Sequence, residues 1–100
     1  MDDITRNIFL AFVRVHLLHH AAEGAIYGVE MIEELAWHGY SLSPGTIYPI
    51  LHSMESGGYL TSRRDVVNGK VRKYYEATDR GREALGRLRE KIKELGGEVL

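Results

Sequence analysis

The chain has 100 residues, 44% of them hydrophobic and 27% charged, which is typical of one folded domain rather than a disordered segment. It contains no cysteine, which excludes disulfides and thiolate chemistry and fits a protein of the reducing cytoplasm. Its apolar run Ile8–Val13 is broken by Arg14, so neither a signal peptide nor a membrane span is expected.

The first predicted helix covers about Ile4 to about Ala22 and stops at Gly24. Helical spacing relates Ile4, Ile8, Phe12 and Val15, whereas other faces of the helix carry Leu10, Val13, Leu17 and Leu18. A helix that is apolar on most sides is usually buried on most sides. In so short a chain, this predicts that a partner subunit covers part of the helix.

A second helix is expected over about Val29–His38, with Tyr27-Gly28 at its start and Gly39 as its C-cap. Its predicted core face consists of Ile32, Leu35 and Ala36. Trp37 falls on the same face as three glutamates, so we expect it to be half-exposed.

The third helix should begin at Ser43-Pro44, because serine is a preferred N-cap and proline a preferred first helical residue. It is expected to reach Ser56, where Gly57-Gly58 stops it. Its core face carries Ile47, Leu51 and Met54. Two helices joined by so short a turn are typical of a helix-turn-helix unit.

Two predicted strands, Tyr59–Val67 and Lys70–Ala77, flank Asn68-Gly69, the dipeptide favoured in two-residue hairpin turns. This turn places Arg64 opposite Lys73 and Asp65 opposite Arg72. The segment from Thr61 to Tyr75 holds five cations and one anion, although the whole chain has a net charge of −1. Like charges facing each other are destabilising, so the arrangement favours an external anion such as DNA phosphate, although a solvated hairpin has the same composition.

The last helix should begin near Thr78, and its apolar residues recur every three or four positions as in a coiled-coil seam. They are Leu85, Leu88, Ile92, Leu95 and Val99. We expect Gly96-Gly97 to fray the end of this helix. The stripe indicates either dimerisation or packing within the chain.

This order of elements predicts an α+β, mostly helical, winged helix-turn-helix fold. Four segments resemble the PadR family of transcriptional regulators: YGVEMI (Tyr27–Ile32), LSPGTIYPIL (Leu42–Leu51), MESGGYL (Met54–Leu60) and KVRKYYEATDRG (Lys70–Gly81). The resemblance spans roughly residues 8 to 90. It implies a cytoplasmic repressor that binds double-stranded DNA as a homodimer. Some members of the family release DNA on binding a small aromatic effector. Drug-sensing relatives carry an aromatic platform in the C-terminal helix, but this chain has no aromatic residue after Tyr75.

The resulting hypothesis divides the chain into a DNA-binding domain (1–77) and a dimerisation helix (78–100). Its DNA-binding residues are Tyr27, Ser43, Thr46, Tyr48, Pro49, His52, Arg64, Lys70, Arg72 and Lys73. Its dimer interface consists of Ile8, Phe12, Leu85, Leu88, Ile92 and Leu95. Three of these residues have structural alternatives: Pro49 as a helix kink, Ser43 as an N-cap and Tyr27 as a core residue.

Two other function classes have weaker support. His16 and His20 lie one helical turn apart, but no carboxylate or fourth ligand with matching spacing is evident, so no metal site and no cofactor are expected. No nucleophile elbow, phosphate loop or pair of catalytic acids is visible, so an enzyme is not expected.

The rival hypothesis is a winged helix that binds protein without reading DNA. The near-neutral charge and the lack of Arg or Asn on the third helix favour this hypothesis.

Overall fold

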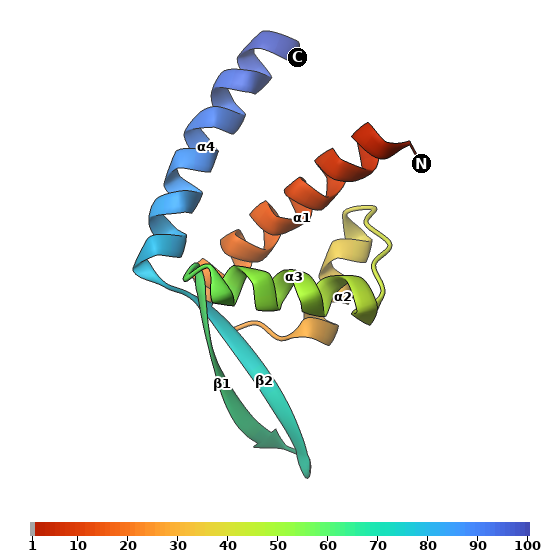
Figure 1. The fold of residues 1–100 in the computed structure, drawn as a ribbon, viewed down its shortest axis with the longest axis vertical. Coiled ribbons are helices and arrows are strands. Elements are labelled where there is room, and N and C mark those ends of the chain that lie inside the picture. Colours follow the sequence, from red (N-terminus) through yellow and green to blue (C-terminus); the bar gives the residue numbers. More distant parts are fainter. Residues whose placement is uncertain (1) are drawn as a thin grey trace.

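The computed structural model describes residues 2–100, which form four helices and one hairpin (Figure 1). In chain order the elements are α1 (Asp3–Glu23), α2 (Gly28–Trp37), α3 (Pro44–Ser56), β1 (Leu60–Val67), β2 (Lys70–Ala77) and α4 (Asp79–Val99). The predicted order and the α+β, mostly helical fold class are confirmed. None of the helices within residues 2–100 has the length and apolarity needed to cross a membrane.

The core lies where α1, α2 and α3 meet the base of the hairpin. Its fully buried side chains include Val13, Leu17, Leu35, Ile47, Leu51, Leu60 and Tyr75. Tyr75 of β2 also pairs with Ile26, through backbone hydrogen bonds of 2.8 and 2.9 Å. This bridge attaches β2 to the segment just before α2, so the hairpin is held beside the start of that helix.

Helix α2 buries a face that overlaps the predicted one only in part. Met31 and Leu35 enter the core, Ile32 is only partly buried, and Ala36 is exposed. Trp37, expected to be half-exposed, is 89% exposed. The expected cap is present, because Gly39 takes the left-handed conformation (φ 89°) just past the helix end and its N–H bonds the Ala36 carbonyl.

The hairpin has the predicted turn and register. Asn68 (φ 52°) and Gly69 (φ 76°) both have positive φ, as a type I′ turn requires. Arg64 pairs with Lys73, and Asp65 pairs with Arg72. The two cations of the first pair therefore stand side by side on one face of the hairpin.

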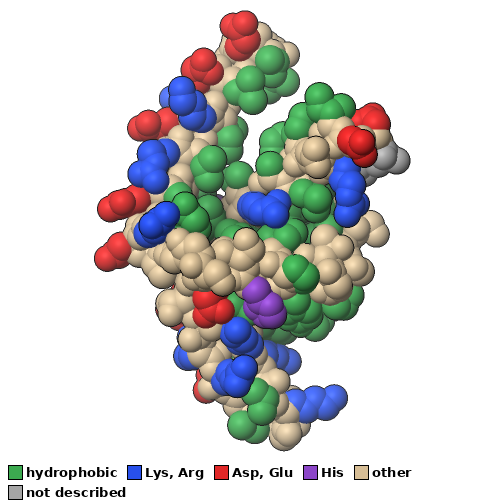
Figure 2. All heavy atoms as spheres, viewed as in Figure 1, with side chains coloured by type: hydrophobic (Ala, Val, Ile, Leu, Met, Phe, Trp, Pro, Cys, Tyr) green, Lys and Arg blue, Asp and Glu red, His purple; other side chains and the backbone are tan. Residues whose placement is uncertain are grey.

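Helix α4 begins as expected, with the Thr78 hydroxyl accepting a 3.0 Å hydrogen bond from the N–H of Gly81. The predicted fraying at Gly96-Gly97 is wrong, because the helix continues to Val99. Helices α1 and α4 diverge from their contact near the hairpin (Figure 1), and hydrophobic side chains gather where the two helices face the opening between them (Figure 2).

Candidate nucleic-acid interface

Helix α3 buries one face in the core and presents the other to solvent. Pro49 and His52 are exposed, Thr46 is half-exposed, and the alternate positions Ile47, Ile50, Leu51 and Met54 are buried. Pro49 lies in the sixth position of the helix, where it has no N–H to donate to the Gly45 carbonyl. The exposed surface of α3 is therefore short, neutral and partly apolar.

Ser43 occupies the N-cap position of α3, but its side chain does not cap the helix. The Ser43 backbone carbonyl accepts the N–H groups of Thr46 and Ile47, whereas its hydroxyl lies 3.3 Å from the Thr46 hydroxyl. The hydroxyl thus leaves backbone N–H groups of the first turn without a side-chain cap. Such a helix start favours an anion, because its N–H groups and dipole carry partial positive charge.

Tyr48, which the sequence predicted as a DNA contact, does not point freely outward. It packs across the start of α2. A Cβ atom at Gly28 would lie 2.5–2.6 Å from Tyr48 ring atoms, so only glycine admits the ring at this distance. Tyr48 is half-buried as a result. Its contact with Gly28 fixes α2 against α3.

Tyr27, Arg72 and Tyr74 form a cluster that joins α2 to the hairpin. The Arg72 guanidinium lies 4.0 Å from the centre of the Tyr27 ring and 3.4 Å from the Tyr74 hydroxyl. The two tyrosine rings meet edge to face at 5.6 Å. Tyr27 is half-buried, so part of its side chain remains at the surface. The cluster holds a guanidinium in place without neutralising it.

Lys73 is the hairpin cation that reaches α3. Its ammonium lies 3.3 Å from a carboxylate oxygen of Glu55, and the other oxygen of Glu55 accepts a hydrogen bond from the Ser62 hydroxyl. The Ser62 hydrogen bond, and then Lys73, hold the pKa of Glu55 below its usual range. Glu55 therefore stays ionised at neutral pH and neutralises the charge of Lys73.

The remaining hairpin cations differ in how far they are neutralised. Arg63 pairs with Glu76 at 3.0 Å and with Asp65 at 3.5 Å. Arg64 and Lys70 have no carboxylate partner within residues 2–100, and Arg72 has only its two tyrosines. Figure 2 shows Lys and Arg side chains gathered on the hairpin.

A groove of about 610 Å³ runs between the start of α2, Tyr48 of α3 and the hairpin. Tyr27, Lys70, Arg72 and Lys73 are among its lining residues. The structure thus brings together the predicted contacts from α2 and the hairpin. Arg64 lies on the face of the hairpin that it shares with Lys73, outside the groove lining.

Sequence reasoning missed three residues of this region: Gly28, Glu55 and Tyr74. Strand alternation contained a signal for Tyr74, since Arg72 and Tyr74 are two residues apart and must share a face of β2. Glu55 gave no comparable signal, because its contact with Lys73 depends on how the hairpin folds back onto α3.

The predicted dimer residues divide into two groups. Leu85 is only 3% exposed and packs within the chain's own core, so it offers little surface to a partner. The others are exposed on two helices: Ile8 and Phe12 on α1, and Leu88, Ile92 and Leu95 on α4. Val99 and Ile4 extend these exposed stripes outward.

Comparison with known proteins gives a consistent result. Residues 17–87 match the transcriptional regulator PadR-like family. The chain is 49% identical over 95 residues to transcriptional regulator Rv3488 of Mycobacterium tuberculosis, covering 95% of this chain and 89% of that protein.

Solved structures show the same fold. A PadR family regulator from Eggerthella lenta is 31% identical with a TM-score of 0.78, covering 98% of this chain and 90% of the other. A PadR-like regulator from Bacillus cereus is 27% identical with a TM-score of 0.80, covering 89% and 88% of the two chains.

Proposed function

Because this chain belongs to the PadR-like family of transcriptional regulators and is not an enzyme, we propose that it represses transcription in the cytoplasm by occupying a two-half-site operator as a homodimer. The observation that supports this best is the cationic groove between α2, α3 and the hairpin. At this groove, a helix of the size that fits the DNA major groove lies beside hairpin cations that no carboxylate neutralises. The net charge of −1 is no obstacle, because phosphate contact depends on local charge.

The proposed contacts fall into three sets. Thr46, Pro49 and His52 face the base edges, and Tyr48 lines the groove beside the start of α2. Ser43 and Tyr27 reach phosphates near the two helix starts. Lys70, Arg72 and Arg64 contact the flanking backbone, and Lys73 joins them to the extent that it leaves Glu55.

Replacing Lys70 or Arg72 by alanine is expected to weaken binding to every DNA sequence by a similar factor. The removal of one phosphate contact should reduce the magnitude of the slope of log K against log salt by about 0.9, because fewer counterions are released. Fluorescence anisotropy over a range of salt concentrations measures this slope. Lys93→Ala on the exposed surface of α4 is the matched control. Equal slopes in Lys70→Ala, Arg72→Ala and the control would show that the hairpin does not contact the DNA.

Thr46→Ala and His52→Ala should instead change which bases are preferred. A single good side-chain contact to a base edge contributes about 1–3 kcal/mol of discrimination, so one or two positions per half-site should lose their preference. Selection from random DNA with each variant measures this. An unchanged consensus in both variants would show that these side chains do not read bases.

The proposed dimer uses the exposed apolar stripes of α1 and α4. Residues 78–100 then act as the dimerisation helix and residues 1–77 as the DNA-binding domain. The stripe on α4 is narrow and flanked by charged residues, as in a helix that meets one partner helix. Pairing the stripes of two chains removes this apolar surface from water.

The same region offers a place for a small aromatic effector. A groove of about 340 Å³ is lined by Phe12 and Val15 of α1 and by Leu85 and Ile92 of α4. An effector there would change the spacing of the two α3 helices, which requires different affinities for two dimer arrangements. Phenolic acids and planar cations should therefore bind less tightly when operator DNA is present. Equal affinity with and without DNA would contradict this part of the proposal.

One observation favours a second function, binding to a protein instead of DNA. The outward face of α3 carries neither arginine nor asparagine, the side chains most used to read guanine and adenine. Selection from random DNA separates the two functions. A reproducible consensus supports the repressor, whereas binding without sequence preference supports the protein-interaction module.

A further inference from the structure

Four of the five histidines lie together, and none of the four lines the groove between α2, α3 and the hairpin. His16, His19 and His20 come from α1, and His38 follows α2. The His16 ring lies 4.7 Å from that of His38, and the His19 ring 5.1 Å from that of His20. The proposed DNA contacts use only the fifth histidine, His52, so this cluster has no role in them.

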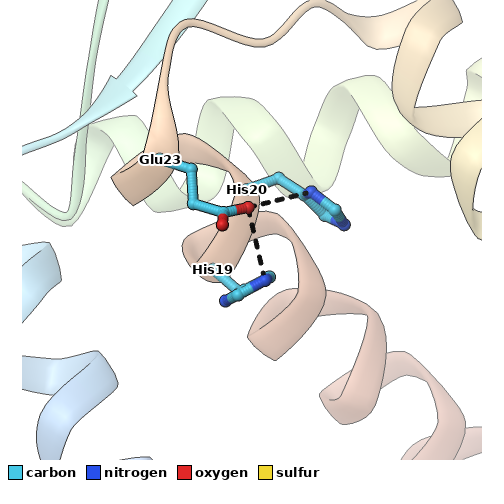
Figure 3. A group of neighbouring side chains, drawn as sticks. All are labelled: His19, His20 and Glu23. Atoms are coloured by element: carbon cyan, nitrogen blue, oxygen red, sulfur yellow. Dashed lines mark ion pairs between the residues drawn. The ribbon is translucent and has the colours of Figure 1, made fainter.

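Within the cluster, His19, His20 and Glu23 direct one ligand atom each to a common point (Figure 3). Glu23 lies one turn beyond both histidines on α1, and one of its oxygens lies 3.4 Å from His19 Nε2 and 3.8 Å from His20 Nδ1. All three ligand atoms are within 4.8 Å of one another. Ligands about 2.0–2.1 Å from a tetrahedral zinc ion stand roughly 3.4 Å apart, so small side-chain rotations would complete three corners.

A neighbouring carboxylate supports the ligand orientation of His20. The other ring nitrogen of His20, Nε2, lies 3.5 Å from a carboxylate oxygen of Glu34, on α2. That oxygen also lies 3.3 Å from His38 Nε2. A histidine that binds metal through one nitrogen usually donates the other N–H to a carboxylate, which fixes the ring and its tautomer. Glu34 is placed to do this, leaving Nδ1 of His20 free for the ion.

From this geometry we propose that His19, His20 and Glu23 bind a divalent cation of the zinc class, with water as the fourth ligand. Two imidazoles and one carboxylate suit zinc, cobalt and nickel better than calcium or magnesium. The spacing HHxxE, from His19 to Glu23, was not recognised from the sequence as a ligand set. The expectation that no carboxylate has matching spacing is therefore wrong, because Glu23 does.

Arg89 of α4 gives the site a distinctive competitor. Its guanidinium lies 3.1 Å from His19 Nδ1. Arginine only donates, so Nδ1 must accept, which puts the proton of the neutral ring on Nε2. A metal ion on Nε2 reverses this arrangement, because the proton then resides on Nδ1 and the hydrogen bond from Arg89 is broken. Metal and Arg89 therefore compete for His19, and removing Arg89 should tighten metal binding.

Calorimetric titration of the full chain with zinc tests the site, and cobalt reports its geometry through the intense visible absorption of tetrahedral cobalt. We expect Glu34→Gln to weaken zinc binding about 10–100-fold, and Glu23→Gln to weaken it more. Arg89→Leu should strengthen it. Glu33→Gln, an exposed change on α2, is the matched control and should leave the affinity unchanged.

Each result supports or overturns the proposal. Weaker binding in Glu23→Gln than in Glu33→Gln, together with tetrahedral cobalt, supports it. Equal affinities in these two variants, six-coordinate cobalt, or no zinc binding by the full chain overturns it. Weaker binding in Arg89→Leu overturns the competition for His19. Circular dichroism establishes that the variants are folded, which is expected because Glu23 and Arg89 are exposed.

Discussion

A chain carrying Leu88→Glu and Ile92→Glu is expected to be monomeric and to lose operator binding almost completely. Both side chains belong to the exposed stripe of α4, at 36% and 47% exposure. Pairing this stripe with a second copy would bury the two carboxylates without partners, which costs several kcal/mol. The monomer keeps both glutamates in water and folds.

The loss of DNA binding follows from the loss of linkage between two half-sites. Two joined DNA-binding domains bind about 10²–10⁴-fold more tightly than one, without any new contact. The double variant should therefore lose about this factor for the two-half-site operator and little for an isolated half-site. A defect in the DNA-binding domain itself would instead also weaken binding to the isolated half-site.

Analytical ultracentrifugation and anisotropy measure the two effects on the same samples. Lys93→Glu is the control, because it adds a carboxylate to α4 outside the apolar stripe. The control should remain dimeric and bind the operator. A wild-type monomer at micromolar concentration, or a dimeric double variant that still binds, would contradict the proposed dimer.

The sequence was most informative where local rules decide the structure. Asn68-Gly69 has few alternatives to a type I′ turn, and this turn determined the pairing of Arg64 with Lys73. Thr78 likewise predicted the start of α4. In both cases, the residues that determine the structure are neighbours along the chain.

Reasoning from the sequence failed where distant packing decides. Gly96-Gly97 is a different case, because the reason is local: both residues have low helix propensity, yet α4 continues through them, since hydrogen bonds of an established helix outweigh two weak positions. Ala36 fits the apolar periodicity of α2, but the packing of α2 against α3 and α1 buries Met31 and Leu35 and leaves Ala36 exposed. Leu85 belongs to the predicted seam, and only the folded chain reveals that it is already buried.

The candidate site divides in the same way. The cations of the hairpin were evident from composition, but their availability was not, because it depends on carboxylates elsewhere in the chain. Glu55 neutralises Lys73 from α3, whereas the predicted contact Arg72 is held by tyrosines and keeps its charge available. One strand therefore carries two neighbouring cations of different availability.

Replacing Gly81 by alanine is expected to destabilise the protein, although alanine is the better helix former. Gly81 lies buried in the first turn of α4, and an added Cβ would overlap the backbone carbonyl oxygen of Tyr59. That carbonyl accepts the N–H of Thr78 at 3.1 Å, and the Thr78 hydroxyl donates to the Gly58 carbonyl. The oxygen cannot retreat without breaking this junction between the hairpin and α4. Overpacking of this kind typically costs about 1–3 kcal/mol.

Gly86 on the same helix is the matched control for Gly81. An added Cβ at Gly86 meets no atom within 4 Å, so only helix propensity acts there. Gly86→Ala should stabilise the chain by about 1 kcal/mol, whereas Gly81→Ala should destabilise it, so the two identical substitutions should differ by about 2–4 kcal/mol. Urea unfolding at fixed protein concentration measures both. Equal stabilisation by the two alanines would mean that the junction tolerates a methyl group. α4 would then not be held against Tyr59. The proposed dimer depends on this contact, because the angle at which α4 leaves the hairpin sets the separation of the two α3 helices.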